Sequence, residues 1–313
     1  MKKMINRIIV EGLLYDDNLK ESETKYINGK LSLLTSNEND PTNVCELRVI
    51  AGERYGNKPD AKKNPNYLEY KRIKEQEHEH NYLRVGKEAL GIQISGSLGA
   101  NYFVPRGQDI KRENVVPILV NNSSFISIVD NSLIEPKAEF ETDIFITSIT
   151  PEMTKGTPEM PAVETGNYLV KGYIFDYKNT AIEVTYIAKK GPEGITSAAD
   201  YFSSLMNSLP VFTKVWGRIN GYITNVERRE ESAFGQAKVV SFKNTKKEYE
   251  LVGALIHPYE DGITEEELKQ ALQAREMEIA SNLERQNNFN SNKQPSAPDF
   301  LKNLNINNKI FEV

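Results

Sequence analysis

The sequence predicts a mainly β fold, with two five-stranded barrels in tandem, then a C-terminal helix and a disordered tail. Most of the chain consists of short segments in which apolar and polar residues alternate, bounded by Asn, Asp, Gly and Pro. This is the pattern of β-strands joined by turns. The order of strands around one helical segment occurs twice, and 313 residues suffice for two domains that each bury a core.

The first domain is expected over residues 1–135. Strands are predicted at 7–14, 26–34 and 44–51, since each segment is β-branched and ends in a turn cluster. Residues 54–88 are polar and charged with a helical period, which predicts a helical insertion. Strand patterns then resume at 91–98, 101–105, 116–120 and 125–129.

The second domain is expected over residues 136–262. It has strands at 138–149, 167–177 and 181–188, a helix at 197–208 with Ser197 near its N-cap, and strands at 211–226 and 247–257. Three strands, a helix and two strands are the order of the five-stranded OB barrel. Because the first domain has the same order, both domains are predicted to be OB-like.

The C-terminal region is predicted to be a helix at 263–286, with Thr264 as its N-cap, and a flexible linker and terminal tip at 287–313. Residues 259–313 carry ten acidic and six basic side chains, most of the net charge of -5. A flexible linker that ends in an apolar tip is expected to be a docking motif for a partner or to fold back on its own chain.

Cysteine content and hydropathy indicate a soluble, cytoplasmic protein. The single cysteine, Cys45, lies in an apolar run, so we interpret it as a buried hydrophobe in a reducing compartment. The apolar run within the first eleven residues is too short for the apolar region of a signal peptide. No segment approaches the 18 consecutive apolar residues of a membrane-spanning helix.

The segment 211–226 offers the strongest candidate for a binding surface. Side chains two apart share one face of a strand. One face carries Val215, Ile219 and Ile223, and the other carries Phe212, Lys214, Trp216, Arg218, Asn220 and Tyr222. If the aliphatic face is core, the other offers rings for base stacking and cations for phosphates. The alternative is that the aromatic side chains are core and the faces are reversed.

A similar alternation occurs at 170–177, where Lys171, Tyr173 and Phe175 share a face. We expect this segment and 211–226 to be neighbouring strands with one aromatic and basic surface. In the first domain the comparable residues are Arg54, Tyr102, Phe103 and Arg106.

Catalytic and metal-binding motifs are weak, so we predict no enzyme, cofactor or metal site. His78 and His80 are two apart on a predicted helix and diverge, and neither a Walker loop nor a Gly-x-Ser-x-Gly elbow occurs. Glu139, Glu141 and Asp143 have the spacing of one strand face and could bind Mg²⁺ in a nuclease. Solvated carboxylates are the commoner reason for such a pattern.

The segment 6–14, with the 26–30 turn that follows it, resembles the first hairpin of bacterial and bacteriophage single-stranded-DNA-binding proteins. Segments 95–98, 101–103 and 165–177 look like those of the phage members. The resemblance implies an OB-fold that binds single-stranded DNA in replication or recombination, with a C-terminal tip that recruits partners. This chain departs from that family in ending Lys309-Ile310-Phe311-Glu312-Val313 rather than in a run of acids.

These observations together predict sequence-tolerant binding of single-stranded DNA. The alternative is a structural or assembly protein, such as a virion component, in which the aromatic faces are subunit interfaces. A metal-dependent nuclease is the third possibility.

Overall fold

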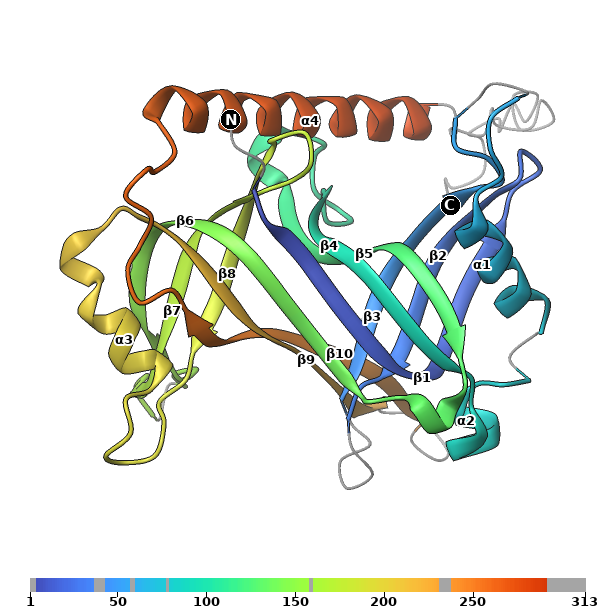
Figure 1. The fold of residues 1–313 in the computed structure, drawn as a ribbon, viewed down its shortest axis with the longest axis horizontal. Helices are drawn as coiled ribbons and strands as arrows, with labels where there is room; N and C mark the ends of the chain where they lie inside the picture. The colour runs from blue at the N-terminus through green and yellow to red at the C-terminus, as the bar shows by residue number, and fades with distance from the viewer. Residues whose placement is uncertain are drawn as a thin grey trace, which may run out of the picture.

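Two β-barrels lie side by side in the structure, a computed structural model, and one long helix crosses both of them (Figure 1). The structure describes residues 4–36, 43–56, 60–76, 79–157, 160–230 and 238–291, without the side chains of 223–230, 238–245 and 288–291. Of the predicted linker and tip at 287–313, residues 287–291 are instead helical, and residues 292–313 lie outside the described residues, as does His78.

The first barrel consists of β1 (Asn6–Glu21), β2 (Tyr26–Leu34), β3 (Val44–Gly52), β4 (Gly91–Phe103) and β5 (Val116–Val129). Its strand order β1-β2-β3-β5-β4 closes on itself because β4 pairs with β1, and β3 pairs with β5 in parallel. Two strands are longer than predicted. β4 joins the segments predicted at 91–98 and 101–105, and β5 joins those predicted at 116–120 and 125–129.

The second barrel repeats this topology with β6 (Lys137–Met153), β7 (Glu164–Phe175), β8 (Ala181–Ala188), β9 (Val211–Glu230) and β10 (Lys238–Ala254). Its order is β6-β7-β8-β10-β9, closed by the β6–β9 pair, and β8 and β10 are parallel. Both barrels therefore have the OB strand order, which confirms the predicted fold class. The barrels join where β1 pairs antiparallel with β6, from Asn6↔Thr142 to Glu11↔Lys137.

The helices lie where the OB order requires them. In the first barrel, the insertion between β3 and β4 contains α1 (Pro65–Glu75), α2 (Tyr82–Val85) and a 3-10 turn at Gly86–Glu88. Asn64 caps α1 by accepting from the Asn66 amide at 3.1 Å, and Pro65 occupies the first turn. In the second barrel, α3 (Ala198–Ser204) begins at the predicted cap Ser197, which forms a capping box with Asp200. Further 3-10 turns lie at Arg112–Asn114, Asn131–Leu133 and Met206–Ser208.

The cores of the barrels form one continuous cluster. Aliphatic side chains fill both interiors, and Tyr70 and Ile73 of α1 and Phe202 of α3 pack against them. In the second barrel the ring centroids of Phe140 and Tyr186 lie 4.8 Å apart, and the ring of Tyr249 packs edge-on against Phe140. The two barrels therefore share one apolar core rather than having two separate ones.

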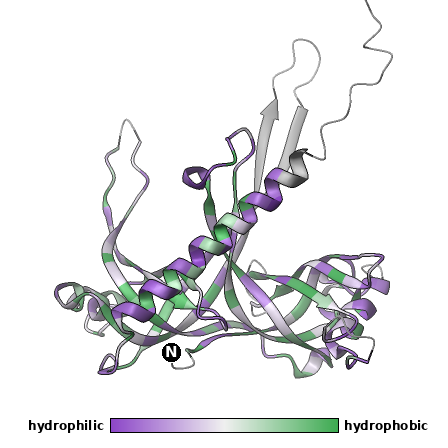
Figure 2. Ribbon diagram, turned by 90° about the horizontal axis from the view of Figure 1, so that it is seen from above, coloured by the Kyte–Doolittle hydropathy of each residue, from purple (hydrophilic) through white to green (hydrophobic). Residues whose placement is uncertain are grey.

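The C-terminal helix α4 (Glu265–Ser291) crosses from the second barrel to the first (Figure 1). Thr264 caps it as predicted, since its Oγ1 accepts from the Glu267 amide at 3.2 Å and Glu267 reaches back to the Thr264 amide at 3.1 Å. Seen from above, polar and apolar residues alternate along its length, so its apolar stripe is narrow (Figure 2). None of the helices in the described ranges is long and apolar enough to cross a membrane.

Candidate nucleic-acid interface

The outer face of β9 carries the predicted aromatic and cationic side chains. Val215 and Ile219 are buried in the barrel core, whereas Lys214, Trp216 and Arg218 point outward. The indole of Trp216 is 40% exposed. The strand therefore has its aliphatic face in the core, as the alternation predicted. The reversed arrangement, with the aromatic face in the core, is wrong for Trp216.

The two predicted strands are not neighbours, which corrects the expectation of one continuous surface. β6 lies between β7 and β9 and pairs with both, placing Asp143 opposite Lys214 and Phe145 opposite Tyr173. Carboxylates of β6 therefore stand beside the cations of β9, and Glu141 forms an ion pair with Lys214 at 3.0 Å.

Phe175 faces outward from the barrel interior, as the alternation predicted, but it does not offer a ring to a ligand. Its side chain has no exposed surface because α4 packs over it, in a cluster with Ala181, Phe212 and Ala271. Tyr173 is partly covered by the same helix, since the guanidinium of Arg275 lies 6.0 Å from its ring centroid. Of the three residues predicted on β7, only Lys171 is exposed.

The residues predicted in the first barrel are also separated. Tyr102 is buried beneath α4, so it cannot stack with a base, and Gln286 of the helix donates to its carbonyl oxygen at 3.4 Å. Arg54 donates from Nη1 to the Ala61 carbonyl at 2.8 Å and holds the chain after β3. Phe103 is half-buried, and Arg106 is exposed on the β4–β5 loop. Among these four, Arg106 is the one placed to reach a ligand.

A groove that the sequence did not indicate lies on the outer face of β2 and β3. Cross-strand pairs place Lys30 opposite Arg48 and Asn28 opposite Ile50. A pocket of about 590 Å³ lies over these four residues and continues across β5 and β4 to Lys247 of β10, with Ile118, Asn101 and Asn121 in its lining. Ile50 and Ile118 are both exposed, so the groove floor is apolar between polar edges.

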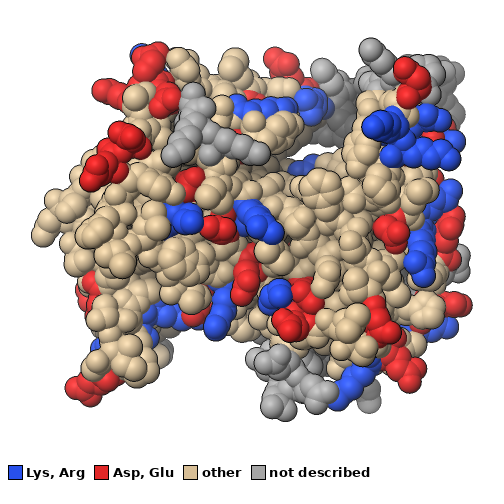
Figure 3. Space-filling model, in the orientation of Figure 1, with Lys and Arg blue, Asp and Glu red and all other residues tan. Residues whose placement is uncertain are grey.

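The groove continues under α4. A second pocket of about 620 Å³ shares Asn101 with the first and is lined by Arg106 and Gln108 of the β4–β5 loop and by Arg285 of the helix. The space-filling view shows a hollow beneath α4 on the side of the first barrel (Figure 3). We call the two joined pockets the groove, with Asn28, Lys30, Arg48, Ile50, Asn101, Arg106, Ile118, Lys247 and Arg285 as its defining residues.

Local charge in the groove is positive although the chain is acidic. The carboxylate of Glu46 lies between Lys30 at 3.1 Å and Lys247 at 3.2 Å. Burial opposes its ionisation, but these two ammonium groups outweigh burial and lower the pKa of Glu46. Arg48 forms no ion pair with any described residue, so its charge is available to an anion.

Glu278 of α4 lies near Arg48, at the rim where the β7–β8 turn of the second barrel approaches. Burial raises the pKa of Glu278, and the nearby Asp176 raises it further, whereas Lys178, Arg285 and Arg48 lower it. Tyr177 in the same turn is 89% exposed. Glu278 therefore takes up a proton at a higher pH than an exposed glutamate does, and the ring centroid of Tyr177 lies 5.3 Å from Nζ of Lys178.

The groove residues of β2 and β3 can be recognised in the sequence from alternation, although none of them is aromatic. In 26–34 and 44–51, Asn28, Lys30, Arg48 and Ile50 stand out of phase with the buried residues. What alternation could not show is that β10 would bring Lys247 to them from about 200 residues away, where it pairs with Glu46.

The described residues contain no group of three or more His, Cys, Asp or Glu placed to hold a metal ion. The candidate Asp143 is engaged structurally, accepting from the Ile5 amide at 2.7 Å and the Tyr259 hydroxyl at 2.9 Å. Burial raises the pKa of the Cys45 thiol to about 12, as expected for a cysteine that packs as a hydrophobe. His80 is exposed.

A family model described as YorF matches residues 5–286. No curated protein matches the chain. Two solved structures of the single-stranded DNA binding protein from Thermus aquaticus are similar at 12% identity. A deletion mutant has a TM-score of 0.46 and covers 85% of this chain and 100% of its own. The wild type has a TM-score of 0.42, covering 84% of this chain and 97% of its own.

Proposed function

This chain belongs to the YorF family, and we propose that it binds single-stranded DNA along the groove between its first barrel and α4. The observation that carries the proposal is the position of the groove. In OB barrels, oligonucleotides bind to the face of the second and third strands and to the loop between the fourth and fifth. The lining of the groove includes these elements, β2, β3 and the β4–β5 loop.

The chemistry of the groove suits a strand of any sequence. Lys30, Arg48 and Arg106 supply cations for phosphates, while Ile50 and Ile118 supply apolar surface for bases. Tyr26 shares the outer row of β2 with Asn28 and Lys30 and is 41% exposed, so it is our candidate for base stacking at the groove end.

The wider role in this proposal is bacteriophage DNA replication or recombination in the host cytoplasm, without catalysis, as the resemblance at 6–14 and 26–30 suggests. Of the residues predicted from sequence, Arg106 belongs to the groove, and Lys171, Lys214, Trp216 and Arg218 remain as outward cations and a ring on the second barrel. The division at residue 135 and a docking role for the terminal tip stay predictions.

The test is fluorescence anisotropy of a labelled 30-nucleotide oligo-dT, titrated with the full chain at several salt concentrations, with a duplex of equal length as control. The affinity for the single strand should fall by about 0.7 log unit per phosphate contact for each tenfold rise in salt. Arg48→Ala should weaken binding and reduce this slope by about one contact.

The matched control is Lys71→Ala, which removes a partly exposed cation on α1, paired with Glu75, outside the groove. Unchanged binding in that variant, with loss in Arg48→Ala, supports the groove. No binding at low salt would remove nucleic acid from the proposal, and a salt-resistant oligomer formed without DNA would favour the structural or assembly role instead.

A further inference from the structure

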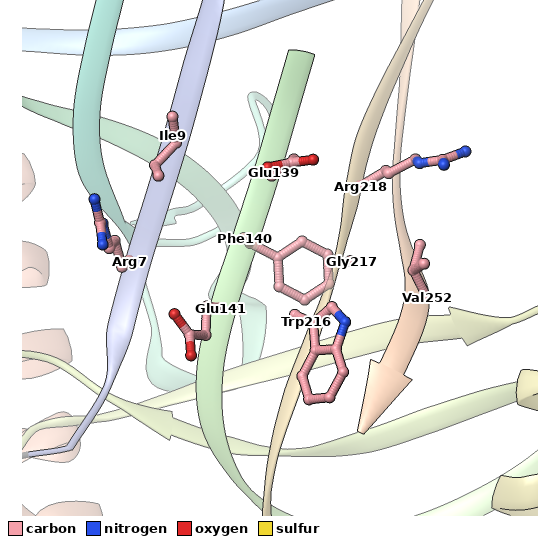
Figure 4. A pocket seen from close by; sticks show the side chains of 9 residues that line it. All are labelled: Arg7, Ile9, Glu139, Phe140, Glu141, Trp216, Gly217, Arg218 and Val252. Atoms are coloured by element: carbon pink, nitrogen blue, oxygen red, sulfur yellow. The ribbon is translucent and has the colours of Figure 1, made fainter. Parts of the chain in front are cut away.

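A separate pocket lies at the seam of the two barrels. The β1–β6 pair brings together outer side chains of four strands around a pocket of about 280 Å³ (Figure 4). Its lining includes Arg7, Glu139, Glu141, Trp216, Arg218 and Val252 and shares no residue with the groove. It lies on β6 and β9, the first and fourth strands of the second barrel, and on β1 of the first barrel. The groove, in contrast, lies on the second and third strands of the first barrel, β2 and β3.

Trp216 lies flat on the backbone of β10 in this pocket. A Cβ atom added to Gly253 would lie 2.3 Å from the indole, so only glycine allows the ring to approach so closely. The β9–β10 register shifts between Leu251 and Gly253 and leaves Val252 exposed beside the indole. One face of Trp216 therefore packs on backbone, and the ring, which lies between Glu141 and Val252, keeps part of its surface exposed to the pocket (Figure 4).

The charges around the ring are mixed. Arg7 and Arg218 form no ion pair with any residue that the structure describes, whereas Glu141 is paired with Lys214. An ionised carboxylate only accepts hydrogen bonds. Glu139 and Glu141 can therefore accept from the exocyclic amino groups of cytosine, adenine or guanine. Thymine has no exocyclic amino group, and its one edge donor, N3–H, lies between two carbonyl oxygens that these carboxylates repel.

We infer that the seam pocket binds one base of the strand, stacked on Trp216, and prefers a base with an exocyclic amino group. Arg7 and Arg218 then neutralise the flanking phosphates and the carboxylates contact the base edge. The inference rests on the proposed function, since the groove brings the strand to the protein. It adds a base preference to binding that is otherwise sequence-tolerant.

The experiment compares labelled 30-nucleotide oligo-dC and oligo-dT with the full chain at pH 7.5, following anisotropy and the fluorescence of Trp216 together. Because Trp216 is the only tryptophan, its quenching reports the seam pocket while anisotropy reports all binding. Oligo-dC should quench Trp216 more strongly than oligo-dT and bind about tenfold more tightly, from one stacked and hydrogen-bonded base.

The variant Glu139→Gln/Glu141→Gln should lose this preference, because an amide donates as well as accepts. Trp216→Phe keeps a ring and should retain tighter binding of oligo-dC, whereas Trp216→Ala should lose it. Equal quenching by both oligomers, or a preference that survives the double variant, overturns the seam pocket. No anisotropy change with either oligomer means instead that the proposed function has failed.

Discussion

The hydroxyl of Tyr249 on β10 donates a hydrogen bond to Oδ1 of Asn121 on β5 at 2.9 Å, and this buried contact joins the second barrel to the first. The amide nitrogen of Asn121 in turn donates to the Glu46 carbonyl oxygen at 2.9 Å. Burial raises the pKa of Tyr249 well above its ordinary value, so this hydroxyl stays protonated and remains a donor. The contact positions β10, and with it Lys247, at the groove.

Tyr249→Phe should lower the free energy of unfolding by about 1–3 kcal/mol, because Asn121 Oδ1 is left buried without its donor. It should also weaken DNA binding modestly by loosening Lys247. Chemical denaturation and oligo-dT anisotropy measure the two effects. Tyr177→Phe is the control, since that ring is almost fully exposed. Equal stability of the two variants would contradict a structural role for the contact.

Phe175→Ala should lower the free energy of unfolding by about 3–5 kcal/mol, since the ring is fully buried between β7 and α4. Phe175→Leu should retain most of the stability and all of the DNA affinity. Urea denaturation of both variants checks this. If Phe175→Leu kept its stability but lost binding, the ring would be a stacking residue after all.

Glu278→Gln should tighten binding of oligo-dT about threefold near neutral pH, because it removes a negative charge close to Arg48 and Arg285 of the groove. Protonation of Glu278 removes this negative charge, and burial raises the pKa of Glu278, so the protonation takes place at a higher pH than for an exposed glutamate. As pH falls toward that pKa the carboxyl takes up a proton, the groove becomes more positive and DNA affinity rises.

In Glu278→Gln this part of the pH dependence should disappear. Affinity is measured between pH 5 and pH 8 at constant ionic strength. Glu284→Gln, an exposed carboxyl on the same helix, should change little. A pH profile identical in Glu278→Gln and the original chain would exclude Glu278 as the titrating group.

Tyr67→Phe should make the free energy of unfolding depend less on pH in the acidic range. The Tyr67 hydroxyl donates to Glu21, and this bond lowers the pKa of Glu21. A carboxyl with a lowered folded-state pKa stabilises the fold above its unfolded pKa, and the contribution is lost as pH falls through the folded value. The variant should therefore lose about 1 kcal/mol at pH 7 and much less near pH 2.

Thermal unfolding across this pH range measures the difference, with Tyr55→Phe as an exposed control. A loss that stays constant with pH would show that Tyr67 stabilises the fold by packing alone.

The sequence by itself determined the order of strands and helices, although two strands of the first barrel, β4 and β5, were each predicted as two segments. Alternation along 7–14, 26–34 and 211–226 predicted the strands and the outward direction of Trp216, because side chains in a strand must point to opposite sides. Ser197 and Thr264 predicted the helix starts, since a hydroxyl placed before a helix satisfies its free amides. These are local properties of the chain.

Only the tertiary structure decided which outward side chains reach solvent. Phe175 and Trp216 both point away from a barrel core, but α4 covers the first and leaves the second open. The groove likewise depends on Lys247 and Arg285 coming from elements far along the chain to the face of β2 and β3. Alternation reports the side of a sheet, whereas exposure depends on what packs on that side, and this is set by contacts between distant segments.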